Sequence, residues 1–365
     1  MMTGARFFRL TPTDTLFFRD GRPYNQDDEG LAHTHSLFPP HPSTLTGALR
    51  AAFAFGQGWN GRDAWPAEYL EVLGDGPDMT GGSLRFGPPM LLRERATGKW
   101  EPLYPAPLSL IGRQIRRTEA DPIGWTDPAL LASGPALNSD LGRVRFPAAP
   151  VAADASRRKA VSDLWLTPAG MACVLAGKPP PFDETHVVHY EDLWQQEPRV
   201  GLELEPGKRT AKAGRLYAPV HVRLASGVAL GQAVSGLKPD WHPAPVVPLG
   251  GEHRSAWVEE AEPPTDLSQP SAGRRCITLI LLSPARVGAD WLKPAWRRLV
   301  ADRVSTWKPG TDSPQASSPA WRAGSSRTAR SRRSNGGQRW ASSSTIRLSA
   351  PSRPAWNGRM PRATP

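Results

Sequence analysis

Apolar and polar positions alternate over several short stretches of the chain, the pattern of β-strands with one buried face. Gly, Pro and Asp-Gly turn signals separate these stretches. Residues 45–55 differ, because their apolar side chains recur at helical spacing directly after Ser43 and Thr44. This order predicts a helix capped by a hydroxyl. Strands are predicted in residues 7–18, 84–86, 89–92, 100–103, 186–190, 199–204, 215–217, 220–224 and 276–282.

These strands form two groups with few helices between them, so we predict an α+β protein. The length of 365 residues fits two domains. We place an N-terminal domain at residues 1–150, a second domain at 151–310 and a tail at 311–365. Residues 116–161 are rich in Pro, Ala and Gly and show little periodicity, which predicts an irregular insertion or an interdomain connection.

The formal net charge of +11 comes almost entirely from the tail. Residues 313–365 hold ten arginines and no lysine, aspartate or glutamate, which leaves 35 basic and 34 acidic residues in residues 1–312. A nucleic-acid interface in the folded part must therefore rest on local clusters. The two cysteines, Cys173 and Cys276, are far apart, which argues against a disulfide framework or a thiolate metal site and favours a reducing cytoplasm. No segment has the length and apolar character of a signal peptide or membrane span.

The tail has two interpretations. Its Ser, Arg, Ala and Pro content is typical of a disordered basic segment that binds RNA non-specifically. Out-of-frame translation of a GC-rich gene also yields such a sequence, with stray tryptophans such as Trp321, Trp340 and Trp356. We expect no strand there, since Ile346, Leu348 and Met360 are its only Ile, Leu, Val, Phe or Met residues. Reading the encoding DNA in its other frames after codon 310 separates the two interpretations.

Signals for catalysis are weak. The pairs His33 and His35, and His186 and His189, lack further residues at metal-ligand spacing, and the P-loop, HExxH and GxSxG motifs are absent. We therefore expect no catalytic residue, metal or cofactor.

Phosphate contacts are a stronger prediction at three places. Arg19 and Arg22 flank the Asp20-Gly21 turn beside aromatic residues, where guanidinium groups suit phosphate, although pairing with nearby acids would also explain them. The segment from Ser43 and Thr44 to Arg50 offers free N–H donors and hydroxyls at a helix start, although capping alone would explain the hydroxyls.

The densest basic run of the folded part lies between two predicted strands. It predicts a hairpin with a basic tip, a structure that commonly inserts along nucleic-acid backbones. Its candidate RNA-binding residues are Lys208, Arg209, Thr210, Lys212 and Arg215.

Four blocks of the sequence, in this order, resemble one family. The blocks are FFRDGRPY, SLFPPHPSTLTGALRAAF, EPRVGLELEPGKRTAKAGRLYAPVHVRL and PLGGEHR. The family is the third RAMP subunit of the type III-B CRISPR effector, the Cmr complex. The resemblance extends over about residues 5–300, and we expect nothing in residues 313–365 to match.

The resemblance implies two packed ferredoxin-like (RRM-like) RAMP domains, the second incomplete here at its C-terminal end. It implies a structural RNA binder in antiviral defence that holds the 5′ repeat-derived tag of the guide RNA. The implied partners are the large Cas10-type subunit and the backbone RAMP subunit. Gly250 and Gly251, in the last block, would let the backbone approach RNA closely, or would simply form a turn.

Two other functions stay open. A guide-processing endoribonuclease of the wider RAMP clan would need an acid–base set, for which His33 or His35 is the nearest candidate, and would cleave precursor repeat RNA without metal. A scaffold whose folded part binds only protein would lose tag binding once the tail is removed.

Overall fold

The computed structural model describes residues 4–19, 32–75, 81–96, 98–139, 142–149, 157–205, 207–208, 210–264, 276–284 and 345–349. The chain forms two compact units. One unit, Met1–Pro270 with Arg275–Pro284 and Ser342–Pro365, contains every described residue. The other, Ser271–Arg274 with Ala285–Ala341, lies outside them.

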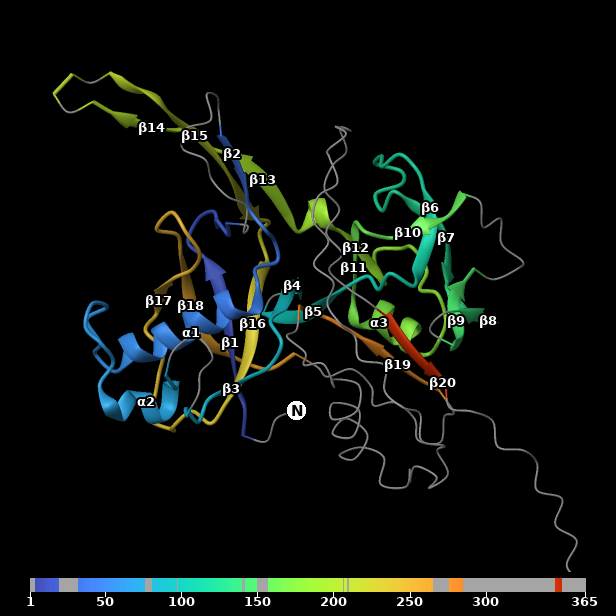
Figure 1. Cartoon of the computed structure of the whole chain (residues 1–365), viewed down its shortest axis with the longest axis horizontal. Helices are drawn as coiled ribbons and strands as arrows, with labels where there is room; N and C mark the ends of the chain where they lie inside the picture. The colour runs from blue at the N-terminus through green and yellow to red at the C-terminus, as the bar shows by residue number, and fades with distance from the viewer. Residues whose placement is uncertain are drawn as a thin grey trace, which may run out of the picture. The chain divides into compact units, whose positions relative to one another are not determined.

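A nine-stranded antiparallel main sheet is the centre of the described structure (Figure 1). Its order is β12-β11-β5-β4-β16-β1-β18-β17, with β3 paired to β16. The strand β1 lies between β16 and β18 and pairs antiparallel with both. These strands are β1 (Arg6–Pro12), β3 (Arg85–Phe86), β4 (Met90–Ala96), β5 (Lys99–Pro105), β11 (Leu164–Leu166), β12 (Val187–His189), β16 (Val228–Ser235), β17 (Val246–Pro248) and β18 (Ser255–Ala261).

The helices α1 (Pro42–Gly56) and α2 (Ala67–Leu73) belong to the core of this sheet. The apolar face of α1 is buried because Leu45, Leu49 and Phe53 recur at helical spacing. Phe53 packs edge-on against Phe8 of β1, with ring centroids 5.1 Å apart. A second apolar core includes Leu110, Trp125 and Met171, the last on α3 (Pro168–Leu175).

The remaining strands form small sheets. They are β6 (Leu110–Gln114), β7 (Trp125–Leu130) and β10 (Lys159–Ala160) in one; β8 (Ala132–Ser139) and β9 (Gly142–Ala148) in another; β19 (Cys276–Ile280) and β20 (Thr345–Ser349) in a third; and β2 (Ala32–His35), β13 (Trp194–Pro198), β14 (Gly201–Leu204) and β15 (Ala211–Leu224) in a fourth, which we call the hairpin sheet.

The α+β class predicted from the sequence is confirmed, and so are the helix after Ser43 and most of the strands. The first strand is shorter than predicted, because β1 ends at Pro12 and a bend follows. The main sheet draws strands from both sides of residue 150, and the division into domains at 150 and 310 stays a prediction.

The prediction of an irregular insertion at residues 116–161 is wrong. The segment contains β7, β8, β9 and β10, and β8 pairs with β9 as a hairpin. Proline content is a poor guide in this segment, because a strand tolerates proline at sheet edges and irregularities, where no ladder hydrogen bond is needed. The register of β8 and β9 shifts between Ser133 and Ala136, the stretch that includes Pro135.

The expectation of a strand-free tail is also wrong at Thr345–Ser349. This segment forms β20, which pairs antiparallel with β19 from Ile280 to Cys276. Polar and apolar residues do alternate in its sequence, TIRLS, so a short strand could have been predicted there. The rest of residues 311–365 lies outside the described residues, and its disorder stays a prediction.

Replacing Phe53 with alanine should lower the free energy of unfolding by about 3–5 kcal/mol, because a fully buried ring at the centre of the α1 interface is removed. Urea titration followed by far-ultraviolet circular dichroism measures this. The control is Phe146→Ala on β9, whose side chain is 56% exposed and should cost less than about 0.5 kcal/mol. Equal losses in both variants would contradict the packing described here.

Candidate nucleic-acid interface

The basic run between residues 205 and 215 forms the predicted hairpin. The strands β14 and β15 pair antiparallel, and the tip closes through a hydrogen bond that the Glu205 N–H donates to the Thr210 carbonyl, 2.8 Å. In β15, residues 220–224 pair with β13 and 217–220 with β2, while the distal part pairs only with β14 among the described residues. We call residues 201–217 the ribbon; Figure 1 shows it extending from β2 and β13.

The tip of the ribbon is exposed and charged. Lys208 is highly exposed and forms an ion pair with Glu205, with nitrogen and oxygen 3.0 Å apart. Thr210 is exposed as well, and Arg209 lies outside the described residues. Lys212 and Arg215 both lie on β15, and their side chains lie outside what the structure describes.

Apolar side chains lie at the base of the ribbon. Leu202 on β14 is 48% exposed, and Val200 just before it is 67% exposed. Large aliphatic groups this exposed, beside a basic tip, form a surface with both apolar and cationic parts.

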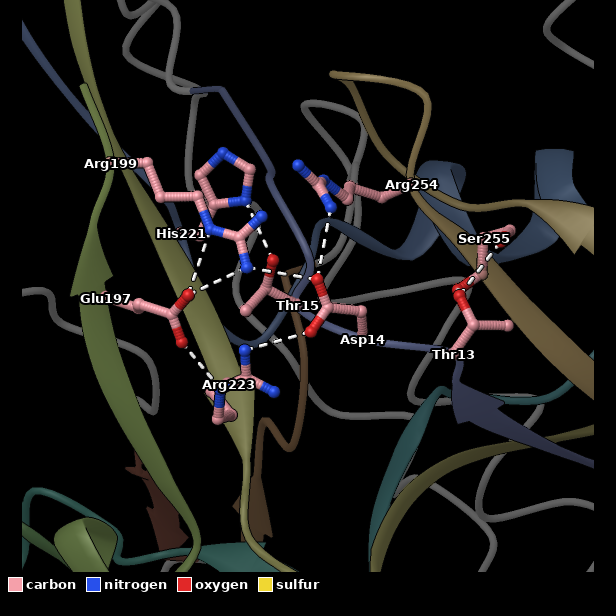
Figure 2. Close-up of polar contacts among 9 residues, drawn as sticks. All are labelled: Thr13, Asp14, Thr15, Glu197, Arg199, His221, Arg223, Arg254 and Ser255. Atoms are coloured by element: carbon pink, nitrogen blue, oxygen red, sulfur yellow. Dashed lines mark hydrogen bonds and ion pairs between the residues drawn. The ribbon is translucent and has the colours of Figure 1, made fainter. Parts of the chain in front are cut away.

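An ion-pair cluster lies where the hairpin sheet meets the main sheet (Figure 2). Asp14, just after β1, accepts hydrogen bonds from Arg199 at 3.0 Å and Arg223 at 2.9 Å. Arg254, just before β18, approaches the same carboxylate at 3.3 Å. Glu197 on β13 also accepts from Arg199 and Arg223. We call these five residues the Asp14 cluster; it holds three cations and two anions.

The cluster fixes the ionisation of Asp14. Partial burial raises the pKa of this carboxyl, but hydrogen bonds from Arg199 and Arg223 outweigh it and lower the pKa to about 2. Arg223 and Arg199 likewise hold the pKa of Glu197 below its usual range. Both carboxylates are therefore charged at neutral pH.

A buried polar contact adjoins the cluster. Thr15 Oγ1 lies 3.0 Å from Nδ1 of His221, whose ring stacks on Phe17. Burial lowers the pKa of His221, so its ring is neutral at pH 7. Leu16 and Val222 exchange two backbone hydrogen bonds of 2.8 Å next to this pair, which joins the two sheets.

Gly250 and Gly251 lie in the loop between β17 and β18 and pack against Phe17, three residues after Asp14. The Gly251 N–H donates to the Phe17 carbonyl at 2.8 Å. Gly250 has a φ of +86°, and a Cβ there would lie 2.4 Å from the Phe17 oxygen. Only glycine fits at position 250, so Gly250 has a role inside the protein. The approach of the pair to RNA stays a prediction.

The helix start differs from the prediction in its cap. The cap is the ring of His41, whose Nδ1 accepts from the Ser43 N–H at 3.3 Å, and not a hydroxyl of Ser43 or Thr44. Pro42 occupies the first helical position, so the cap at His41 lies two residues before Ser43. The Thr44 N–H donates to the His41 carbonyl at 2.9 Å, so two donors of the predicted anion site are already used.

The predicted arginines lie in different settings. Arg19 is exposed, and its backbone forms a bridge with Ser36; Arg22 lies outside the described residues. Arg50 is buried on α1, where it donates to the Gly74 carbonyl at 2.8 Å and lies over the Trp65 ring. Burial lowers the pKa of Arg50. The structure therefore places the backbones of Lys208, Thr210, Lys212 and Arg215 on the ribbon, whereas Arg50 and Ser43 lie on α1.

The histidines have protein partners. His186 Nδ1 lies 2.7 Å from an Asp183 oxygen, and His189 is buried and accepts from the Glu191 N–H. His35 is exposed on β2, and the side chain of His33 lies outside what the structure describes. Among the described residues, no group of three or more His, Cys, Asp or Glu residues could hold a metal ion.

The family model of the CRISPR-associated protein Cas_Cmr3 matches residues 8–327. The chain belongs to this family. The resemblance stated from the four sequence blocks is thereby confirmed. The match runs beyond residue 312, so the prediction that nothing in residues 313–365 matches is wrong; the Cas_Cmr3 family extends at least to residue 327 here.

The chain is also similar to subunits of solved complexes. One is the cryo-EM structure of the type III-B Cmr-beta complex bound to cognate target RNA, with 14% identity, a TM-score of 0.40, and coverage of 82% of this chain and 75% of that chain. A second, bound to cognate target RNA and AMPPnP, has 14% identity, a TM-score of 0.38 and coverage of 82% and 74%. No curated protein matches. No helix among the described residues is long and apolar enough for a membrane span.

Sequence reasoning missed the Asp14 cluster. Its arginines are single residues at separate places in the chain, and none of them lies in a basic run. A signal was present nonetheless, because Arg199 and Arg223 lie in the third of the four blocks that carry the family resemblance and Arg254 in the fourth.

Asp14→Asn should destabilise the protein in a pH-dependent way. The folded pKa of about 2 lies below the ordinary value of 3.8, so the stabilisation is present above about pH 4 and is lost as the pH falls toward 2. Urea unfolding of both proteins at several pH values measures it, with the exposed Asp240→Asn as control. A difference that is the same at pH 2.5 and pH 7 would contradict this assignment.

Proposed function

We propose that this Cas_Cmr3 member is a structural, non-catalytic subunit of a type III-B CRISPR effector, and that it holds the 5′ repeat-derived tag of the guide RNA. The observation that carries the proposal is the ribbon: an exposed two-stranded extension with a basic tip on a member of this family. A ribbon of this kind reaches along a nucleic-acid backbone without needing a cavity.

The ribbon suits single-stranded RNA. Lys208, Lys212 and Arg215 would supply cations for phosphates, and Arg209 and Thr210 belong to the same stretch of sequence. Leu202 offers exposed apolar surface on which unstacked bases can rest. Single strands present both groups at once, whereas a duplex hides its bases.

Further tag contacts are proposed at Arg19 and Arg22, at the start of α1 through Ser43 and Thr44, and at Gly250 and Gly251. The neighbours proposed in the complex are the large Cas10-type subunit and the backbone RAMP subunit. Two ferredoxin-like RAMP domains are proposed for the fold; the two apolar cores, one with α1 and one with α3, support this.

Replacing Lys208 and Lys212 with alanine should weaken binding of a 5′-tag RNA. The slope of log affinity against log salt should fall by about 0.7 for each phosphate that the variant no longer neutralises. Fluorescence anisotropy over a salt series measures both quantities. The matched control is Lys178→Ala with Lys238→Ala, which removes the same charge from sites outside the ribbon. If both double variants lose affinity and slope equally, the ribbon is not the tag site.

Incubation with precursor repeat RNA in the presence of a chelator should leave the RNA intact, because the proposed role is to hold RNA. Denaturing gels with end-labelled RNA provide the readout. Specific cleavage that His35→Ala abolishes would overturn the proposal in favour of a processing endoribonuclease.

A further inference from the structure

The hairpin sheet, which carries the ribbon, meets the main sheet at a root where Trp194 of β13 and Leu224 of β15 also pack against the apolar core. Leu16 and Val222 form an isolated backbone bridge there, and the Asp14 cluster lies beside it. The Thr15–His221 contact supports this bridge, and the Asp14 cluster adds ion pairs across the same root. Within the cluster, Glu197 lies on β13 and so binds arginines of its own sheet, whereas Asp14 follows β1 and binds across the root.

We propose that Asp14 is the positioning residue that sets the direction of the ribbon, and through it the presentation of the basic tip to RNA. The second part of this inference rests on the proposed function. Asp14 binds Arg199, which directly follows β13, and Arg223 on β15, and Arg254 ties the same carboxylate to the start of β18.

The length of β15 makes the angle of the ribbon at the root important. From Arg223 to Ala211 the strand rises by about 40 Å, at roughly 3.3 Å per residue. A rotation of about 10° at the root would therefore move the tip by about 7 Å, more than twice the roughly 3 Å length of a hydrogen bond. Small changes at Asp14 become large displacements at Lys208.

Loss of the Asp14 charge should open the root. Three guanidinium groups would then face one carboxylate, and their repulsion favours separation of Arg254 from the two arginines of the hairpin sheet. Asp14→Asn keeps the shape of the side chain and removes the charge, so packing around Leu16 is retained.

The first measurement needs no RNA. Spin labels at Thr210→Cys and Glu71→Cys, in full-length protein with Cys173→Ala and Cys276→Ala, report the distance between tip and main core. Asp14→Asn should widen the distance distribution at least twofold. The matched control Glu260→Gln removes another carboxylate–arginine pair, which Arg6 and Glu260 form at 2.6 Å within the main sheet, and should leave the width unchanged. An unchanged width in Asp14→Asn would overturn the inference.

The second measurement uses 5′-tag RNA. Asp14→Asn should weaken affinity about 3- to 10-fold with an unchanged salt slope, since every phosphate-contacting residue is still present. Asp14→Glu, which keeps the charge, should recover most of the affinity. Glu197→Gln removes the same charge from the same cluster but not across the root, so it should weaken binding less than Asp14→Asn.

Whether Asp14→Asn weakens or tightens RNA binding distinguishes a positioning role of the cluster from direct RNA contact by its arginines. If the cluster arginines contacted RNA themselves, Asp14→Asn would free them and tighten binding, and that result would overturn the positioning role. The proposed function fails separately, when removal of Lys208 and Lys212 leaves tag binding unchanged. In that case a wider distance distribution in Asp14→Asn would still support the structural part of the inference.

Discussion

The antiparallel register of β1 against β18 is the constraint on which the interface depends. Pro12 lies opposite Ala256, so two residues further on the same register brings Asp14 opposite Arg254. The other neighbour of β1 is β16, which follows β15 after a short turn, and so the hairpin arm carrying Arg223 arrives at the same end of the sheet. One pairing thus gathers charges from three distant parts of the chain around a single carboxylate.

Local patterns predicted local structure well. The helix α1 and the ribbon could be predicted because each depends on a pattern within about 20 residues. For α1 the pattern is the helical spacing of apolar residues. For the ribbon it is a basic run between two stretches of alternating polarity. The Asp14 cluster could not be predicted from the sequence. Alternation of polar and apolar residues shows that a strand has a buried face, but it does not show which strand lies beside it. Asp14 and Arg254 are separated by 240 residues.

The errors share a physical origin. Rules for caps and strands describe average preferences, and each error occurs where a neighbour changes the outcome. Pro42 shifted the cap of α1 to the ring of His41, which stands in for the usual hydroxyl. In residues 116–161, prolines hid strands that tolerate them in small sheets. At β20, pairing with β19 gives a five-residue segment a partner that composition alone could not reveal.

The central place of β1 also has a consequence for how the protein is made. Its partners β16 and β18 end at Ser235 and Ala261, so the first strand leaves the ribosome long before either neighbour exists. At about 5–20 residues per second, the delay is roughly 10–50 s. During that time Phe8 and Leu10 can be covered only by earlier segments such as α1. The core of the main sheet is therefore completed late in synthesis, and the Asp14 cluster is complete only once Arg254, just before β18, has been made.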